Sequence, residues 1–417
     1  MSNVRSVAGG PFIFGVTSKC STPSSAVALN VGKCSAIYFS EPFRIFFPLG
    51  LFLGAIGVAL WPLFVWHAID FYPAQAHIRL MIEGLMGSFI IGFLGTAGPR
   101  LLGASPLVAA ETCLLLLLQI ASALLHVLQR QTAGDILFLV LLLFFVSIMA
   151  KRAGARNDLP PPQLVLVLFG LINAIAGIFL ITAAKSLTNG SFANRLGSLM
   201  LNEGFVLFPI LGVGAFFFPK LLGGAEPEPS DVRIAITLWV KRAAIAALTG
   251  VVIWSSFVLE AIGWIRTAGL LRGLTTVTYF VSQGHLLEEP SGPPFLARCF
   301  RLGALLLVAG LFLPVALPGY RLASLHLAFI GGFSVILFTV STRVIVGHTG
   351  QSHLFRKRLR FLVAALTLLV IAMIARVGAD FVPPARDSHL VYAALIWLLA
   401  ATIWIVALAP KLSMSEE

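Results

Sequence analysis

The sequence is poor in charged residues, which make up 11% of its 417 positions; soluble domains typically have about 25%. Intrinsic disorder is excluded as well, because disordered chains are rich in charge. The four cysteines show no CxxC or CxxCH spacing, so no disulfide framework, iron–sulfur site or covalently attached c-type haem is indicated. Walker, GxSxG, Rossmann and HExxH patterns are also absent, which leaves hydrolases and nucleotide-driven enzymes without support.

Apolar residues dominate instead: 58% of the chain is hydrophobic and its mean hydropathy is +0.96. Such a chain needs a lipid bilayer as its solvent. The net charge of +12 then serves to orient the chain, because basic residues are favoured in cytoplasmic loops. We therefore expect an all-α polytopic membrane protein whose main partner is the bilayer, with no nucleic-acid partner.

Segments long enough to cross the bilayer core, about 20 residues each, recur twelve times. The predicted spans are 43–65, 79–98, 106–128, 134–150, 162–184, 199–218, 243–264, 267–283, 298–317, 320–342, 359–378 and 389–409. The fourth and eighth are the least typical, since both are short and the eighth contains Arg272.

Charge bias predicts the topology. With both termini cytoplasmic, the inner segments hold 19 lysines and arginines and the outer segments hold 9, as the positive-inside rule requires of an even number of spans. Residues 1–40 are expected to form a flexible cytoplasmic tail. Residues 41–410 are expected to form one membrane domain with four helices in each of 41–150, 160–285 and 295–410.

The second, sixth and tenth spans end alike. Arg100, Lys220 and Arg343 are each followed by two or three aliphatic residues and a glycine, and they are 120 and 123 residues apart. Four spans separate each from the next. This spacing predicts three four-helix repeats around a pseudo-threefold axis.

Seventeen residues before each of these basic residues stands a polar residue: Glu83, Glu203 or His326. Seventeen residues of helix span about 25 Å, which puts all three in the outer third of the bilayer. Ionisable groups there usually face the bundle interior, so the three would converge on the axis as a borderline-to-hard metal site. The alternative is a local partner for each, such as Arg79 four residues before Glu83.

Histidines provide a second set of ligand candidates. Five are expected near the outer helix ends, where most would be polar anchors at the membrane surface: His67, His77, His126, His326 and His389. His77 and His326 differ from the others, because His77 lies one or two turns above Glu83 and His326 lies well inside its span. Two neutral imidazoles from facing helices usually hold a b-type haem in a bundle.

His348 belongs elsewhere, because the 22 residues from His326 span about 33 Å of helix. Two interpretations of the segment 347–350 remain open. Arg343 and His348 would organise a second metal or haem-propionate site at the inner face. Alternatively, the segment would be a helix C-cap with a glycine stop, followed by the basic run 356–358 on anionic lipid.

Three segments resemble the NnrS family of bacterial membrane proteins. They are Glu41 to Arg44, His77 to Arg100 and, most specifically, His326 to Gly350, which contains Thr-Arg-Val and then Gly-His-Thr-Gly. The resemblance covers most of the chain from about residue 41 onward. It implies a twelve-span protein of the bacterial cytoplasmic membrane, associated with nitric oxide and denitrification responses and carrying haem and copper.

By this resemblance the matched histidines are His77, His326 and His348. The chain departs from the family pattern at the start of the second span, where many members read His-x-His-Glu-Met and this chain has the residues 77–81, His-Ile-Arg-Leu-Met. The departure removes a histidine and an acid from the expected copper ligands, and Glu83 would substitute for them.

A more distant, architectural resemblance is to the haem-copper oxidase core, with three four-helix units. There the tenth span carries two histidines, whereas this chain has only His326 inside that span, and its sixth span has Glu203 and no histidine. Oxygen reduction is therefore not expected, since a shared fold does not carry function.

We thus predict a membrane protein with His-ligated haem b, and with copper or another metal, that handles nitric oxide or metal–nitrosyl species. The candidate cofactor-binding residues are His77, His326, Arg343 and His348, and the candidate metal ligands are His77, His326, Glu83 and Glu203. The alternatives are a twelve-span secondary transporter, although transporters usually have inverted or two-half symmetry, and an assembly factor for haem or copper. The sequence does not distinguish catalysis from binding.

Overall fold

The computed structural model describes residues 37–187, 190–222, 232–289 and 295–414. Within these ranges the chain is helical and has no strand. The α-helices are α2 (Phe43–Val65), α3 (Ala74–Arg79), α4 (Gly87–Leu101), α5 (Ala109–Val127), α6 (Gln131–Gly154), α7 (Val165–Ala184), α8 (Ser191–Leu199), α9 (Phe205–Leu221), α10 (Val232–Ala261), α11 (Ile265–Ser282), α12 (Phe295–Ala316), α13 (Arg321–His326), α14 (Val335–Gly347), α15 (Arg360–Phe381) and α16 (Arg386–Leu412).

Shorter segments connect these helices. The π-helices η1 (Leu80–Met86), η3 (Met200–Gly204) and η5 (Leu327–Ser334) join α3 to α4, α8 to α9 and α13 to α14. The 3-10 turns η2 (Pro162–Leu164), η4 (Pro318–Tyr320), η6 (Ser352–Arg356) and η7 (Pro383–Ala385) precede α7, α13, α15 and α16. Most of the predicted tail, residues 1–36, lies outside the described residues, as does the Glu-Pro repeat at 226–229.

Eleven helical segments of the described chain are long and apolar enough to cross a membrane, which confirms an all-α polytopic membrane protein. Each matches a predicted span, and the first has the predicted bounds, Phe43–Val65. The remaining predicted span is α11, which is less apolar because it carries Arg266 and Arg272. It lies between α10 and α12 and contacts both.

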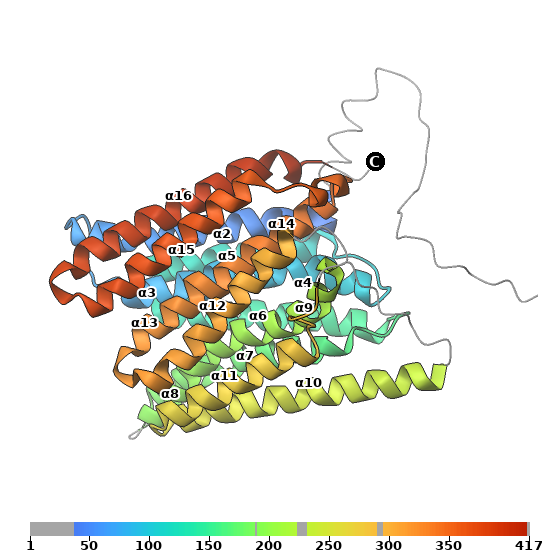
Figure 1. Cartoon of the computed structure of the whole chain (residues 1–417), viewed down its shortest axis with the longest axis horizontal. Helices are drawn as coiled ribbons and strands as arrows, with labels where there is room; N and C mark the ends of the chain where they lie inside the picture. The colour runs from blue at the N-terminus through green and yellow to red at the C-terminus, as the bar shows by residue number, and fades with distance from the viewer. Residues whose placement is uncertain (1–36, 188–189, 223–231, 290–294, 415–417) are drawn as a thin grey trace, which may run out of the picture.

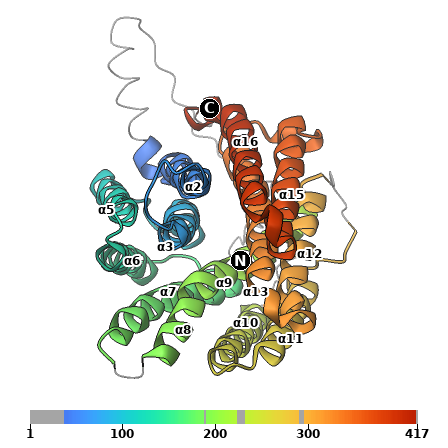
Figure 2. The ribbon, with the colours of Figure 1, turned by 90° about the vertical axis from the view of Figure 1, so that its left-hand side faces the viewer.

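The helices lie roughly parallel (Figure 1) and follow one another around the molecule in chain order (Figure 2). The eleven candidate spans and α11, taken in chain order, make three groups of four. Contacts between α6 and α7, and between α11 and α12, join consecutive groups, and α16 packs on α2 to close the ring. We call the groups unit 1 (α2 to α6), unit 2 (α7 to α11) and unit 3 (α12 to α16).

The second span of each unit lines the centre of the ring. The most apolar windows of these three spans are 83%, 67% and 61% buried. Apart from α2, at 61%, the other candidate spans are 33–50% buried. Each central span also contains one of the π-helices η1, η3 and η5. A π-helix is a rare element, common at functional sites, so its recurrence in all three units supports the predicted threefold repeat.

Glycines bring the central spans close to their neighbours. A Cβ at Gly197 of α8 would lie 2.8 Å from the carbonyl oxygen of Gly177 in α7, and a Cβ at Gly310 of α12 would lie 2.6 Å from the backbone nitrogen of Ala328 in η5. Small residues allow this close approach of helix backbones, which drives helix packing in membranes. The packing fixes the positions of η3 and η5, beside which the site is built.

Candidate cofactor cavity

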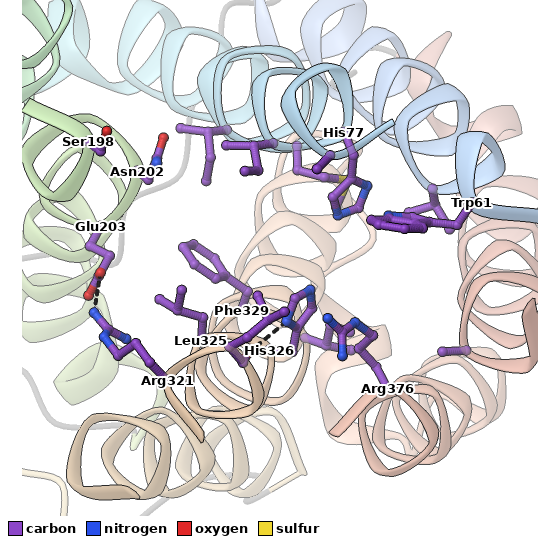
Figure 3. Close-up of a pocket in the computed structure, with 18 of the residues that line it drawn as sticks. Trp61, His77, Ser198, Asn202, Glu203, Arg321, Leu325, His326, Phe329 and Arg376 are labelled. Atoms are coloured by element: carbon purple, nitrogen blue, oxygen red, sulfur yellow. Dashed lines mark hydrogen bonds and ion pairs between the residues drawn. The ribbon is translucent and has the colours of Figure 1, made fainter. Parts of the chain in front are cut away.

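A cavity of about 510 Å³ lies among the central spans, at the end of the ring where α3, α8 and α13 begin. We call this end the cavity end. Side chains of α2, α3, η1, α8, η3, α13, η5, α15 and α16 form its walls, and apolar residues such as Trp61, Leu325 and Phe329 contribute much of the lining (Figure 3). Its volume lies within the range of small-molecule and cofactor sites, about 300–1,000 Å³.

His77 and His326 both line this cavity, one from unit 1 and one from unit 3 (Figure 3). Nδ1 of His77 lies 2.9 Å from the carbonyl oxygen of Gly57, and Nδ1 of His326 lies 2.9 Å from that of Leu322. A carbonyl oxygen only accepts, so each Nδ1 carries the proton and each Nε2 keeps its lone pair. This arrangement typically orients a histidine that binds a metal through Nε2.

Packing restrains the His77 ring further. Trp61 of α2 meets the ring edge-on, with centroids 5.9 Å apart. The carbonyl of Gly57 is within reach of Nδ1 because α2 approaches closely here: a Cβ at Gly57 would lie 2.9 Å from Cβ of Leu80. The sequence therefore places a small residue where a backbone carbonyl must meet the imidazole.

The acids on the cavity wall are neutralised by arginines. Glu203 and Glu260, which line the cavity, share Arg272 and Arg321. Arg272 donates to Glu203 at 2.6 Å and to Glu260 at 2.8 Å. Arg321 donates to Glu260 at 2.6 Å and also to Glu203. We call these four residues the Glu203 quartet. Both carboxylate oxygens of Glu203 accept from guanidinium groups, which would compete with a metal ion, so its role as a metal ligand stays a prediction.

A second charged group lies inside unit 1, which we call the Glu83 cluster: Arg79, Glu83, His126 and Asp135. Arg79 donates to the two oxygens of Asp135 at 2.6 and 3.1 Å. Nε2 of His126 lies 3.0 Å from Oε2 of Glu83. Possible metal-ligand atoms of Glu83, His126 and Asp135 lie within 4.8 Å of one another. Among the described residues, no other group of three histidines, cysteines or acids lies so close together. Arg79 also contacts Asn202 on the cavity wall at 3.2 Å.

The predicted convergence of Glu83, Glu203 and His326 on the axis is wrong. Glu83 is turned toward α5 and α6 of its own unit. Glu203 pairs instead with Arg272 of α11 in its own unit and with Arg321 of α13 in unit 3. The two carboxylates therefore have separate partners and do not meet. The alternative, an i,i+4 ion pair between Arg79 and Glu83, is present at 3.3 Å. Of the three residues, only Glu203 and His326 line the cavity.

Sequence reasoning missed His126 and Asp135. His126 was interpreted as an anchor at the membrane surface, yet it is 1% exposed. Its ring fits because Gly134 has no side chain; a Cβ there would lie 2.4 Å from Cε1 of His126. The sequence did contain a signal for this cluster: Asp135 is an acid at the start of an apolar span, and it follows His126 by nine residues.

His348 lies at the opposite end of the ring, in a polar network that joins four helix ends. Arg100 contacts its Nε2 and also pairs with Glu41. Arg44 donates to the backbone oxygen of His348 at 3.3 Å, and the ring of Phe43 lies tilted against the imidazole with centroids 4.9 Å apart. Burial of the imidazole lowers the pKa of His348 below its usual value.

The segment around His348 ends a helix, as one interpretation predicted. Helix α14 ends at Gly347, His348 is its C-cap, and Gly350 adopts a left-handed φ of +66°. The guanidinium of Arg343 lies over the ring of Phe355, 3.9 Å from its centroid. Neither Arg343 nor His348 lines the cavity, so their role in cofactor binding stays a prediction.

The family described as "NnrS protein" matches residues 37–415. None of the curated proteins matches the chain.

Proposed function

Because the chain belongs to the NnrS family, we propose that it is a membrane protein that binds haem b and acts in the response to nitric oxide. The observation that carries the proposal is that His77 and His326 line one cavity and both have Nδ1 bonded to a backbone carbonyl. That hydrogen bond leaves Nε2 as the free ligand atom and raises its basicity. Two such nitrogens are the usual ligands of a b-type haem inside a helix bundle.

The rest of the cavity suits the same group. Its volume of about 510 Å³ and its largely apolar lining favour a flat hydrophobic ligand. A haem held there would supply an iron centre that binds nitric oxide or carries an electron. Trp61, Leu325 and Phe329 would exclude water from it. Nitric oxide is neutral and small, so it would reach the cavity through lipid without an aqueous channel.

A second metal ion is the weaker part of the proposal, and the Glu83 cluster is where it would bind. Glu83, His126 and Asp135 supply two carboxylates and an imidazole, a donor set that suits Zn²⁺, Mn²⁺ or Fe²⁺ better than Cu⁺. Arg79 already pairs with Asp135 and competes with a bound cation. Metal analysis of the purified protein tests this part: loss of a stoichiometric metal in His126→Gln supports it, and a metal-free wild type contradicts it.

We further propose that the protein lies in the bacterial cytoplasmic membrane with both termini cytoplasmic and the cavity end facing outward. The excess of basic residues in the segments assigned to the inside supports this orientation. Cysteine labelling from outside intact cells would test it. A cysteine placed at exposed Ser388, near the cavity end, should react, and one placed at exposed Arg156, at the other end, should not.

The decisive test of haem binding is the absorption spectrum of the detergent-purified protein, oxidised and reduced. We expect a Soret band that moves on reduction and again on addition of nitric oxide. His77→Ala and His326→Ala should each lose most of the haem, because each removes one of the two nitrogens that would hold it.

The matched control is His389→Ala. His389 also bonds through Nδ1 to a backbone carbonyl, that of Ala375 at 3.1 Å, but it does not line the cavity. Its variant should keep full haem content. Full haem content in folded His77→Ala and His326→Ala would refute the paired ligation. A wild-type protein that stays colourless after haem is supplied would favour transport instead.

A further inference from the structure

Arg376 is a buried cation with few partners. It comes from α15 of unit 3, is 7% exposed and lines the cavity. A guanidinium has five N–H donors, yet in the described chain Arg376 makes one hydrogen bond, to Asp380 at 3.2 Å. Its remaining nitrogens are not among the fully enclosed atoms, so they are open to an acceptor in the cavity.

Buried arginines elsewhere in the ring differ. Arg272 donates to Ser256, Glu203 and Glu260, and Arg79 donates to both oxygens of Asp135 as well as to Asn202. In units 1 and 2 the buried guanidinium is thus satisfied by protein groups, whereas in unit 3 it is not.

The position of Arg376 is central to the site. Its guanidinium lies beside His326 in Figure 3, and its charge acts on both His326 and His77. The acids of the cavity wall do not neutralise it, because Glu203 and Glu260 are already balanced inside the Glu203 quartet. Asp380 pairs with Arg376 but does not line the cavity, so the lining itself holds more arginines than acids.

Trp397 of α16 also lines the cavity and is 2% exposed. Its indole nitrogen is fully enclosed and has no hydrogen-bond partner in the described chain, so it is not open to a ligand as Arg376 is. The donors of Arg376, set in a largely apolar lining, favour a ligand that carries an anionic oxygen as well as an apolar surface.

We propose that Arg376 binds a carboxylate of the cavity ligand, so that the site selects a haem by its free propionates and not only by its iron. This inference rests on the proposed haem binding. A planar guanidinium matches a carboxylate with two parallel hydrogen bonds, and the contact would fix the haem in one orientation between His77 and His326.

The test compares haem b with its dimethyl ester, in which both propionates are masked and the iron is unchanged. Haem-free protein is titrated with each ligand, and Kd is read from the Soret band. The wild type should bind the free acid about tenfold or more tightly, the ratio expected of a charge-assisted hydrogen bond. In Arg376→Gln the preference should fall to within about threefold, with the affinity for the ester little changed.

Two further variants isolate the contact. Arg376→Gln leaves the carboxylate of Asp380 unpaired, so the double variant Arg376→Gln/Asp380→Asn shows the effect without that extra charge and should also lack the preference. Arg266→Gln is the matched control, because Arg266 is exposed and does not line the cavity. It should keep the full preference.

The outcomes separate the two proposals. If the wild type binds neither ligand, haem binding itself fails. If it binds both equally well, haem binding stands and the role of Arg376 is refuted. A preference that survives unchanged in Arg376→Gln and in the double variant also refutes it, since another group would then hold the propionates.

Discussion

Arg272 sits in the middle of an apolar span because two carboxylates, Glu203 and Glu260, accept its hydrogen bonds. Removing one partner of a buried ion pair leaves an uncompensated charge and costs about 3–5 kcal/mol. Arg272→Met should lower the stability by that amount. Arg266→Met, in the same helix but at an exposed position, should change it by less than about 1 kcal/mol. Denaturant unfolding in detergent measures both, and equal losses would contradict the role of the quartet.

At the residue scale, the sequence was a better guide to which polar residues belong to a site than to which residues they contact. His77 and His326 were singled out and do line one cavity. Glu83, in contrast, was expected to face the axis and faces His126 and Asp135. Spacing along one helix tells which residues share a face, but it does not tell which neighbouring helix packs against that face.

At the scale of elements, close packing of α12 on η5 positions the helix that carries His326. A Cβ at Gly310 would meet backbone atoms of Ala328 at 2.6 to 2.9 Å, so Gly310→Ala must push η5 away. We expect a loss of about 1–3 kcal/mol and weaker haem binding. Gly154→Ala, with no atom within 4 Å of the added carbon, should be neutral or slightly stabilising. Thermal unfolding and haem titration test both, and unchanged values in Gly310→Ala would contradict the packing argument.

Element positions were largely predictable, because a span is a long apolar run and needs only composition to be found. The π-helices were not, since no residue type marks them. Each π-helical turn holds about one residue more than an α-helical turn and so rotates the residues that precede it relative to those that follow. The direction of Glu83 could not be derived by counting 17 residues back from Arg100, since that count passes through η1.

At the scale of the whole molecule, the network around His348 ties the ends of α2, α4, α14 and α16 together. Burial lowers the pKa of His348, so the folded protein holds this imidazole neutral while the unfolded chain protonates it below about pH 6.5. Stability should therefore fall as pH falls below that value, because a new positive charge would face Arg100 and Arg44.

Thermal unfolding between pH 7.5 and pH 5 measures this effect. The Tm of the wild type should fall more steeply than that of His348→Gln, which has no imidazole to protonate. Parallel Tm curves for the two proteins would show that protonation of His348 does not lower the stability.

The threefold repeat, predicted from the spacing of Arg100, Lys220 and Arg343, is supported by the recurring π-helices. The closure of the ring by α16 against α2 was not predictable, because no pattern within one span encodes its partner at the far end of the chain.

The Glu203 quartet also has a consequence for biogenesis. Its two acids and Arg272 belong to unit 2, whereas Arg321 belongs to unit 3. During synthesis, unit 2 therefore enters the membrane one positive charge short, and α13 brings the missing charge more than a hundred residues after Glu203 has emerged. The arrival of α13 completes the neutralisation before α15 and α16 complete the cavity wall, so a nascent chain stopped before Arg321 would carry an unbalanced acid in unit 2.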